Sequence, residues 1–242
     1  MSEHTVAQLA ERQMRQWAIG LEVEQRRQHE EAAKPLPESV HPYLTISRDT
    51  GAGAGELAHQ VGRRLGWEVL DRELLDYMAT QYQIPKAMVE WVDETTTSWL
   101  VDTFGKWLDR RLVTESEYLT HLGQLVLLAA QSQSTIFVGR GAQFFLPRDR
   151  GLILQLVAPL EQRLQRVMQR DGVDEVQARR YLEQTDRDRR AFIRESFHCE
   201  VTDPHLYDLV LNLEHLSLEE ASELIVSQCE RRFGVTRMEG AS

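Results

Sequence analysis

A short glycine-rich segment contains the residues of this sequence that are best suited to binding an anion. Gly51, Gly53 and Gly55 alternate with alanines directly after an apolar run, in the segment RDTGAGAGE. Glycines permit positive φ angles, so successive amides can point into a concave anion site. A helix predicted to begin near Glu56 would aim the positive end of its dipole at the same place. We therefore expect polyphosphate to bind the backbone of Gly51, Ala52, Gly53, Ala54, Gly55 and Glu56.

The loop lacks two side chains that usually accompany a phosphate-binding loop. With Gly53 aligned to the glycine before the lysine of G-x-x-x-x-G-K-[ST], Ala54 occupies the lysine position and Gly55 the Ser/Thr position. Arg48 then lies at the position of the first glycine. From these residues alone three interpretations of the segment are possible: a strand–helix turn without a ligand, a dinucleotide-binding turn, or a degenerate mononucleotide loop. The second interpretation fits poorly, because the glycine spacing is not G-x-G-x-x-G.

A magnesium ion would find few side-chain ligands in this loop. The Ser or Thr that usually ligates Mg²⁺ is replaced by Gly55. Magnesium usually keeps several waters and needs only one or two carboxylates besides the phosphates. Asp49, Glu56 and Asp71 are available, and the sequence assigns no metal ligand among them.

The elements that must position this loop are short apolar runs alternating with helices. The runs lie at 43–47, 67–70, 135–139, 152–158 and 208–213, and helices are predicted at 56–65, 159–171, 174–197 and 217–232. This alternation predicts a five-stranded parallel sheet covered on both faces, an α/β fold with three layers, α/β/α. Ligands of such sheets bind beyond the carboxyl ends of the strands, where Arg48, Asp71 and Arg140 would gather.

The chain divides into an extension and one domain. Residues 1–40 are predicted to form an N-terminal helical extension, whose partial apolar stripe would pack on the domain or on the second subunit of a homodimer. Residues 41–235 form the domain, with a helical insertion at about 85–132 and an arginine-rich lid at about 174–200.

Composition excludes several classes of protein. The net charge of −10 argues against nucleic-acid and anionic-membrane binding, and no apolar run approaches the roughly 20 residues that span a bilayer. The N-terminus does not resemble a secretory signal, and the two cysteines have no metal-ligand spacing, so we expect a cytoplasmic protein with reduced thiols. Lysine occurs only at Lys34, Lys86 and Lys106, so phosphate chemistry in the second half of the chain must use arginine.

Four collinear segments resemble the cytidylate kinase-like family, a branch of the P-loop nucleoside monophosphate kinases. They are ISRDTGAGAGELAHQVGRRLGWEVLDRELL, IFVGRGAQFFLP, DRDRRAF and DPHLYDLVLNLEHLS, and the resemblance covers about residues 43–232. It implies a P-loop NTPase-like fold, and ATP with Mg²⁺ as the phosphoryl donor. The implied reaction is phosphoryl transfer to a nucleoside monophosphate or a related small acceptor.

The resemblance also implies roles for residues at the ends of the first two strands. Arg48 would supply part of the cationic charge that Ala54 cannot, although an ion pair with Asp49 or Asp71 would explain it equally well. Asp71 and Arg72 match the Asp-Arg of the acceptor region, where an arginine fork suits a monophosphate. Asp71 is also well placed to cap the following helix.

Arg140, in the segment VGRGA, matches the Gly-Arg motif after the third strand. The resemblance makes it a contact to the substrate phosphate, and a buried structural arginine is the alternative. Cytidylate kinases proper have Gly-Arg-Asp here, and Gly141 replaces that acid. The acceptor for a cytosine amino group is therefore missing, which leaves the identity of the acceptor open.

The lid of the family matches QTDRDRRAFIRESF. In the family the arginines of the lid close over the transferring phosphates, so the resemblance makes Arg187, Arg189, Arg190 and Arg194 candidates and Asp186 and Asp188 the acids that orient them. Of these, Arg187 and Arg190 are the expected catalytic residues, together with Arg48 and Arg140. On a helix Arg187, Arg190 and Arg194 share one face, and Asp186, Arg189 and Arg190 share another. A solvated, salt-bridged helix is the alternative.

Two classes of function follow. The first is an ATP-dependent nucleotide kinase, and the retained arginines favour it. The second is a non-catalytic nucleotide- or phosphate-binding regulatory protein with a degenerate P-loop, and the absent lysine favours it. A structural or interaction protein is supported only by the tryptophan-bearing insertion and the N-terminal helix.

Overall fold

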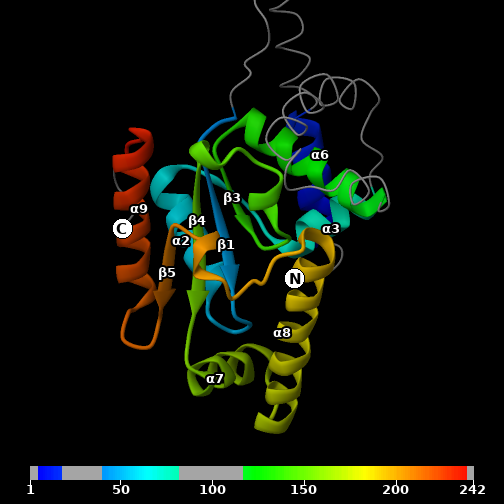
Figure 1. Ribbon diagram of the computed structural model, residues 1–242, viewed down its shortest axis with the longest axis vertical. Helices are drawn as coiled ribbons and strands as arrows, with labels where there is room; N and C mark the ends of the chain where they lie inside the picture. The colour runs from blue at the N-terminus through cyan, green and yellow to red at the C-terminus, as the bar shows by residue number, and fades with distance from the viewer. Residues whose placement is uncertain (1–4, 18–39, 82–116, 239–242) are drawn as a thin grey trace, which may run out of the picture.

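A five-stranded parallel sheet forms the centre of the protein. The computed structural model describes residues 5–17, 40–81 and 117–238. The strands are β1 (Tyr43–Arg48), β2 (Glu68–Leu70), β3 (Thr135–Val138), β4 (Gly151–Val157) and β5 (Leu209–Asn212), in the spatial order β2-β3-β1-β4-β5 (Figure 1). Every neighbouring pair is parallel, which confirms the predicted sheet.

The central strand β1 is apolar on both faces because each face packs against helices. Tyr43 belongs to one core cluster together with Phe137, whereas Leu44 and Ile46 belong to the other. Successive side chains of a strand point to opposite faces, so a near-continuous apolar run fits a sheet that is covered on both sides.

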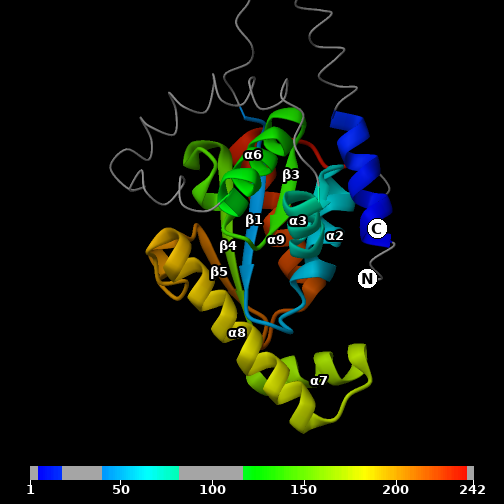
Figure 2. The same ribbon diagram turned by 90° about the vertical axis from the view of Figure 1, so that its right-hand side faces the viewer.

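Two layers of helices cover the sheet. Helices α2 (Ala54–Leu65) and α9 (Leu218–Phe233) pack on one face. Helices α3 (Arg72–Gln81) and α6 (Glu117–Ser132) pack on the other (Figure 2). This is the predicted three-layer α/β/α arrangement. No helix in the described ranges is both long and apolar enough to cross a membrane.

Helices α7 (Leu160–Asp171) and α8 (Glu175–Phe197) project beyond the carboxyl ends of the strands (Figure 1). They have a small core cluster of their own, which includes Leu164, Val167 and Leu182. A capping box of Asp174 and Gln177 starts α8. The helix predicted over 174–197 is α8, and its role as a lid stays a prediction.

A helix over residues 5–17 packs on the domain itself. Its buried side chains, Val6, Ala10, Met14 and Trp17, join the core cluster that contains α3 and α6. Gln13 donates a hydrogen bond of 2.8 Å to Glu68 on β2. The predicted apolar stripe thus has an intramolecular partner, and a homodimer stays a prediction. The described part of the predicted insertion is α6, and residues 82–116 lie outside the described ranges.

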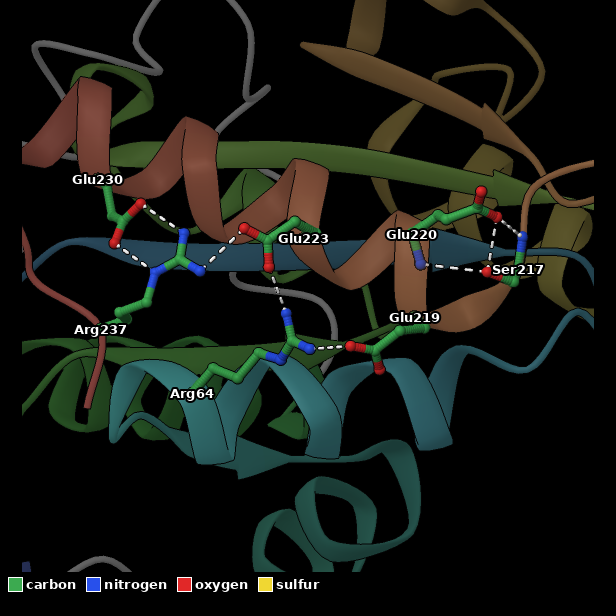
Figure 3. A network of polar contacts seen from close by, with 7 residues as sticks. All are labelled: Arg64, Ser217, Glu219, Glu220, Glu223, Glu230 and Arg237. Carbon is green, nitrogen blue, oxygen red and sulfur yellow. Dashed lines mark hydrogen bonds and ion pairs between the residues drawn. The ribbon is translucent and has the colours of Figure 1, made fainter. Parts of the chain in front are cut away.

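An ion-pair network holds α2 against α9 (Figure 3). Arg64 near the end of α2 contacts Glu219, and its Nη1 lies 2.6 Å from Glu223. Arg237, in the segment after α9, pairs with Glu223 and Glu230 at 2.9 Å each. The network joins α2, α9 and the C-terminal segment, and α9 begins at a capping box of Ser217 and Glu220.

Candidate functional site

The glycine loop leads from β1 into α2 through two residues in the left-handed region. Gly51 has φ 78° and Gly53 has φ 92°. A Cβ on Gly51 would lie 2.9 Å from the carbonyl oxygen of Arg163, so position 51 requires glycine for space as well as for φ. Helix α2 begins at Ala54, two residues earlier than predicted, because the amide of Leu57 already bonds the carbonyl of Gly53 at 3.0 Å.

Most of the loop amides are free to bind an anion. The amide of Ala52 closes a turn on the carbonyl of Asp49 at 3.2 Å, so it is already bonded within the loop, and its binding of phosphate stays a prediction. Within the described ranges the amides of Gly51, Gly53, Ala54, Gly55 and Glu56 have no hydrogen-bond partner. Three of them belong to the first turn of α2, where a helix leaves its donors unsatisfied and has its positive dipole end.

The loop opens into a cavity of about 610 Å³. The predicted phosphate-binding residues all line it, with Arg48, Asp71 and Arg72 from the neighbouring strand ends. Three further arginines line it as well, Arg166 and Arg170 on α7 and Arg189 on α8. Beside it lies a smaller cavity of about 60 Å³, which Arg140 and Arg190 line. Arg48, Asp49, Arg72 and Arg189 line both cavities.

Arg48 forms no ion pair in the described part of the chain, although the charge of Asp71 acts on it. The alternative of an ion pair with Asp49 or Asp71 is wrong, because neither acid pairs with it. Its guanidinium passes over Gly139, where a Cβ would collide with Nη1. Burial lowers the pKa of Arg48 to about 9, and the charges of Arg189 and Arg72 add to this. Arg48 is still protonated at neutral pH, so a bound anion would be stabilised here.

Arg140 is held by an acid that the sequence reasoning missed. Its Nε donates to Asp76 Oδ1 at 2.5 Å, its Nη2 bonds the other carboxylate oxygen, and the guanidinium lies 4.9 Å from the ring centre of Phe192. Tyr118 also donates to Asp76, at 2.6 Å. Burial alone would lower the pKa of Arg140, but Asp76 outweighs it and raises the pKa. Arg140 thus has an ion pair but is only half-buried, and both its contact with a substrate phosphate and the structural alternative stay predictions.

Gly141 follows Arg140 for a steric reason. It has φ 64°, and a Cβ at this position would lie 2.5 Å from the ring of Phe197. The ring of Phe197 stacks on Phe144 at 4.4 Å between centroids. The space that an acidic side chain at position 141 would need is occupied by this aromatic stack.

Asp71 and Arg72 lie at the mouth of the large cavity. Asp71 Oδ1 accepts from the amide of Leu74 at 2.9 Å, so its alternative role as a cap of α3 is confirmed. Arg72 Nε lies 3.9 Å from Asp76, and the arginine side chain is 40% exposed. Arg72 is therefore only loosely paired, and it lines both cavities.

Helix α8 directs Arg189, rather than Arg187, toward the loop. Arg189 Nη1 donates to Thr50 Oγ1 at 2.9 Å and to the carbonyl of Arg48 at 3.4 Å. Arg190 is exposed and lines the small cavity, whereas Arg187 is exposed and lines neither. The apolar side chains of α8 could have shown which arginine faces the loop. They recur at helical spacing, and positions 186 and 189 fall on the same face. These apolar side chains are Ala178, Leu182, Ile193 and Phe197.

Helix α7 contributes three arginines that the sequence reasoning also missed. Arg166 Nη1 donates to the carbonyl of Ala52 at 3.2 Å. Arg163 Nη1 bonds Asp186 at 2.7 Å and the carbonyl of Thr50 at 3.3 Å. Arg163, Arg166 and Arg170 are spaced by three and four residues, so the helix predicted over 159–171 could have placed them on one face.

Asp49 is the acid most closely associated with both cavities. Burial raises its pKa, Arg163 opposes the rise, and Asp186 adds to it. Asp49, Glu56 and Asp71 all line the large cavity. No group of three or more His, Cys, Asp or Glu side chains in the described ranges forms a metal site. A metal at this cavity would therefore take one or two carboxylates and rely on ligand oxygens for the rest.

Comparisons with known proteins found relatives in sequence and among solved structures. A cytidylate kinase of Methanopyrus kandleri is 33% identical over 106 residues, which are 40% of this chain and 55% of that protein, so the chain spans about half the length of this relative. The crystal structure of an uncharacterized protein from Eubacterium ventriosum has a TM-score of 0.61 at 18% identity, covering 78% of this chain and 99% of that one. A shikimate kinase from Acinetobacter baumannii has a TM-score of 0.42 at 17% identity, with 80% and 95% covered.

The model of the cytidylate kinase-like family matches residues 43–215, the segment that contains the sheet, the glycine loop, α7 and α8. This match extends over more than half of the chain. All five strands lie in this segment, as do the first three motifs and most of the fourth, and the chain therefore belongs to the cytidylate kinase-like family.

Proposed function

We propose that this protein is an ATP-dependent kinase that transfers the γ-phosphoryl group to a nucleoside monophosphate or a related small acceptor. One observation carries the proposal: five free amides of residues 51–56 face a cavity of about 610 Å³ that is also lined by Arg48, Arg166, Arg170 and Arg189. Phosphoryl transfer depends mainly on positioning and on neutralising negative charge, and amides and guanidinium groups supply both.

The large cavity suits the donor. The loop amides and the start of α2 would hold the phosphates of ATP, as helix N-termini commonly do. Arg48 and Arg189 lie at the base of the loop and would take over the charge of the absent lysine. Mg-ATP, when bound, supplies the transferable group and part of the charge neutralisation, and Asp49 and Asp71 are the carboxylates that would hold the metal.

The small cavity suits the phosphate end of the acceptor. It is lined by Arg48, Arg72, Arg140 and Arg190, so an anion there would be next to the donor cavity through the shared Arg48 and Arg72. The ion pair of Arg140 with Asp76 leaves Arg72 and Arg190 as the more accessible cations of this cavity. The products would be ADP and the phosphorylated acceptor.

Purified protein incubated with Mg-ATP and a panel of nucleoside monophosphates tests the proposal. We expect ADP and one matching diphosphate to appear together, and Arg189→Ala to lower turnover about 10²–10³-fold, as the loss of a charge-stabilising donor usually does. Arg179→Ala is the matched control, because Arg179 is on the same helix, pairs with Glu175 at 3.0 Å and lines neither cavity. Absence of turnover with every acceptor would reject a nucleotide kinase.

A non-catalytic nucleotide sensor is the second candidate, and one observation favours it. Ala54 at the lysine position is buried and apolar, so the loop has no side-chain cation of its own. In this case ATP would raise the melting temperature by mass action without any ADP being formed. Thermal shift and turnover measured on the same sample separate the two candidates.

A further inference from the structure

Thr50 links the glycine loop to α8 through two hydrogen bonds to one carboxylate. Its backbone amide and its hydroxyl both donate to Oδ1 of Asp186, at 2.8 Å and 2.5 Å. The residue is only 2% exposed, so these bonds are made away from solvent. A hydroxyl has a single proton, and since Asp186 accepts it, the oxygen of Thr50 must accept the bond from Arg189 Nη1 at 2.9 Å.

The second oxygen of Asp186 closes the connection to α7. Oδ2 accepts from Arg163 Nη1 at 2.7 Å, and both side chains are 14% exposed. The same nitrogen donates to the carbonyl of Thr50 at 3.3 Å. Three elements that are remote in sequence, the loop, α7 and α8, therefore meet at one carboxylate, whose two oxygens both already accept hydrogen bonds.

This arrangement determines where Arg189 lies. The guanidinium is anchored to the hydroxyl of Thr50 and the carbonyl of Arg48, and its Nε is buried without a partner among the described residues. It lines both cavities. Without Asp186 the hydroxyl of Thr50 would be free to rotate, and its lone pairs would no longer be held toward Arg189.

We propose that Asp186 is a positioning residue for phosphoryl transfer. It fixes the glycine loop and, through Thr50, sets the guanidinium of Arg189 against the donor phosphates, while its own oxygens contact protein groups. The proposal rests on the proposed kinase function for its catalytic consequence, and on the contacts of Asp186 with Thr50, Arg163 and, at 4.0 Å, Arg189 for the geometry.

Asp186→Asn is the principal variant. The asparagine amide has a single acceptor oxygen, so it keeps the bond to Thr50 only by turning its NH₂ group toward Arg163. In either orientation the charged link to α7 is lost. We expect kcat to fall about 10²-fold, the size of effect that a misplacement near 1 Å produces, with the KM for ATP changed only a few-fold. A rise in KM for ATP with kcat unchanged would overturn the proposal, because Asp186 would then bind the substrate.

Variants at position 50 keep the test valid if Asp186→Asn fails to fold. Thr50→Val removes the hydroxyl and should lower kcat about as much as Asp186→Asn does. Thr50→Ser keeps the hydroxyl and should have a kcat close to that of the wild type. The double variant Asp186→Asn, Thr50→Val should be no worse than the more impaired single variant, since both break one connection. Additive losses would contradict the linkage. Glu183→Gln, an exposed acid on α8 that lines neither cavity, is the charge-matched control.

Hydrogen exchange at the amide of Thr50 tests the geometry without turnover. Wild-type protein should protect this amide in the absence of nucleotide, and Asp186→Asn should expose it. Suppose that the amide is protected in wild type and exposed in Asp186→Asn, and that no acceptor is phosphorylated. The proposed kinase function is then rejected, and the link between Asp186 and Thr50 is retained. Rapid exchange in wild type would overturn the link itself, whatever the activity.

Discussion

The two ends of α2 are both rich in arginine, and they differ in how the positive charge is balanced. At the C-terminal end Arg64 and Arg237 share the carboxylates of Glu219, Glu223 and Glu230, so each of these two guanidinium groups contacts two acids (Figure 3). At the N-terminal end Arg48 has no ion pair within the described ranges, and Arg166 bonds the carbonyls of the loop.

The difference separates an arginine that holds a structure together from one that is available to a ligand. Arginine next to several carboxylates is already neutralised and stabilises the contact of two helices. Arginine that is buried beside other cations has a lowered pKa, as Arg48 does at about 9, and the protein tolerates this cost where an anion is expected to bind. Charge balance, more than residue type, marks the candidate site.

Replacing one arginine at each end of α2 should give the largest contrast. Arg48→Ala is expected to lower turnover about 10²–10³-fold, because a cation at the transferring phosphates is lost. Arg64→Ala, at the other end, should leave kcat and KM within about two-fold, because its charge is used by Glu219 and Glu223. Steady-state kinetics on both variants make the comparison. Equal losses from the two substitutions would show that the charge balance of the two ends has no functional meaning.

Acid should weaken the loop end of α2 through Asp186. Burial alone would raise the pKa of Asp186, but the hydrogen bonds from Thr50 and Arg163 outweigh it and lower the pKa below 3.8. A carboxylate with a depressed pKa in the folded state stabilises the protein fully above its unfolded pKa, and this stability is lost as the pH falls through the folded pKa.

Denaturant unfolding of wild type and Asp186→Asn between pH 7 and pH 3 measures this term. We expect the wild type to be more stable at pH 7 and the difference to shrink below about pH 4. A difference that is constant over the whole range would mean that the charge of Asp186 does not contribute to stability.

The smallest effect is expected at the paired end. Arg64→Ala should lower the free energy of unfolding by about 1 kcal/mol or less, since its glutamate partners are largely exposed, which corresponds to a melting temperature lower by about 2–4 °C. Calorimetry or thermal fluorescence measures it. A loss of several kcal/mol would place Arg64 among the core contacts instead.

The sheet and the position of the glycine loop could be predicted from sequence because they depend on local patterns. Apolar runs alternating with helices require a parallel sheet, and parallel strands bring Arg48, Asp71 and Arg140 to one edge whatever the strand order. The six residues from Gly51 to Glu56 line the cavity for the same reason.

The partners of the arginines could not be predicted in the same way. Whether Arg187 or Arg189 faces the loop depends on the rotation of α8 about its axis, which the apolar stripe of that helix indicates and residue type alone does not. Likewise Asp76 meets Arg140 only because α3 packs beside the end of β3, a contact between residues far apart in sequence. Residue type indicated the kind of chemistry, and packing determined which arginine is available for it.

The close approach of Phe197 to Gly141 has a consequence for how specificity can change in this chain. An acid at position 141 has no room while the ring of Phe197 stacks on Phe144. Acquiring a base-recognising carboxylate here is therefore a two-step path, in which the core aromatic must shrink before the acid can enter. The first step costs stability because it truncates a buried ring, so the core packing of Phe197 closes position 141 to an acid.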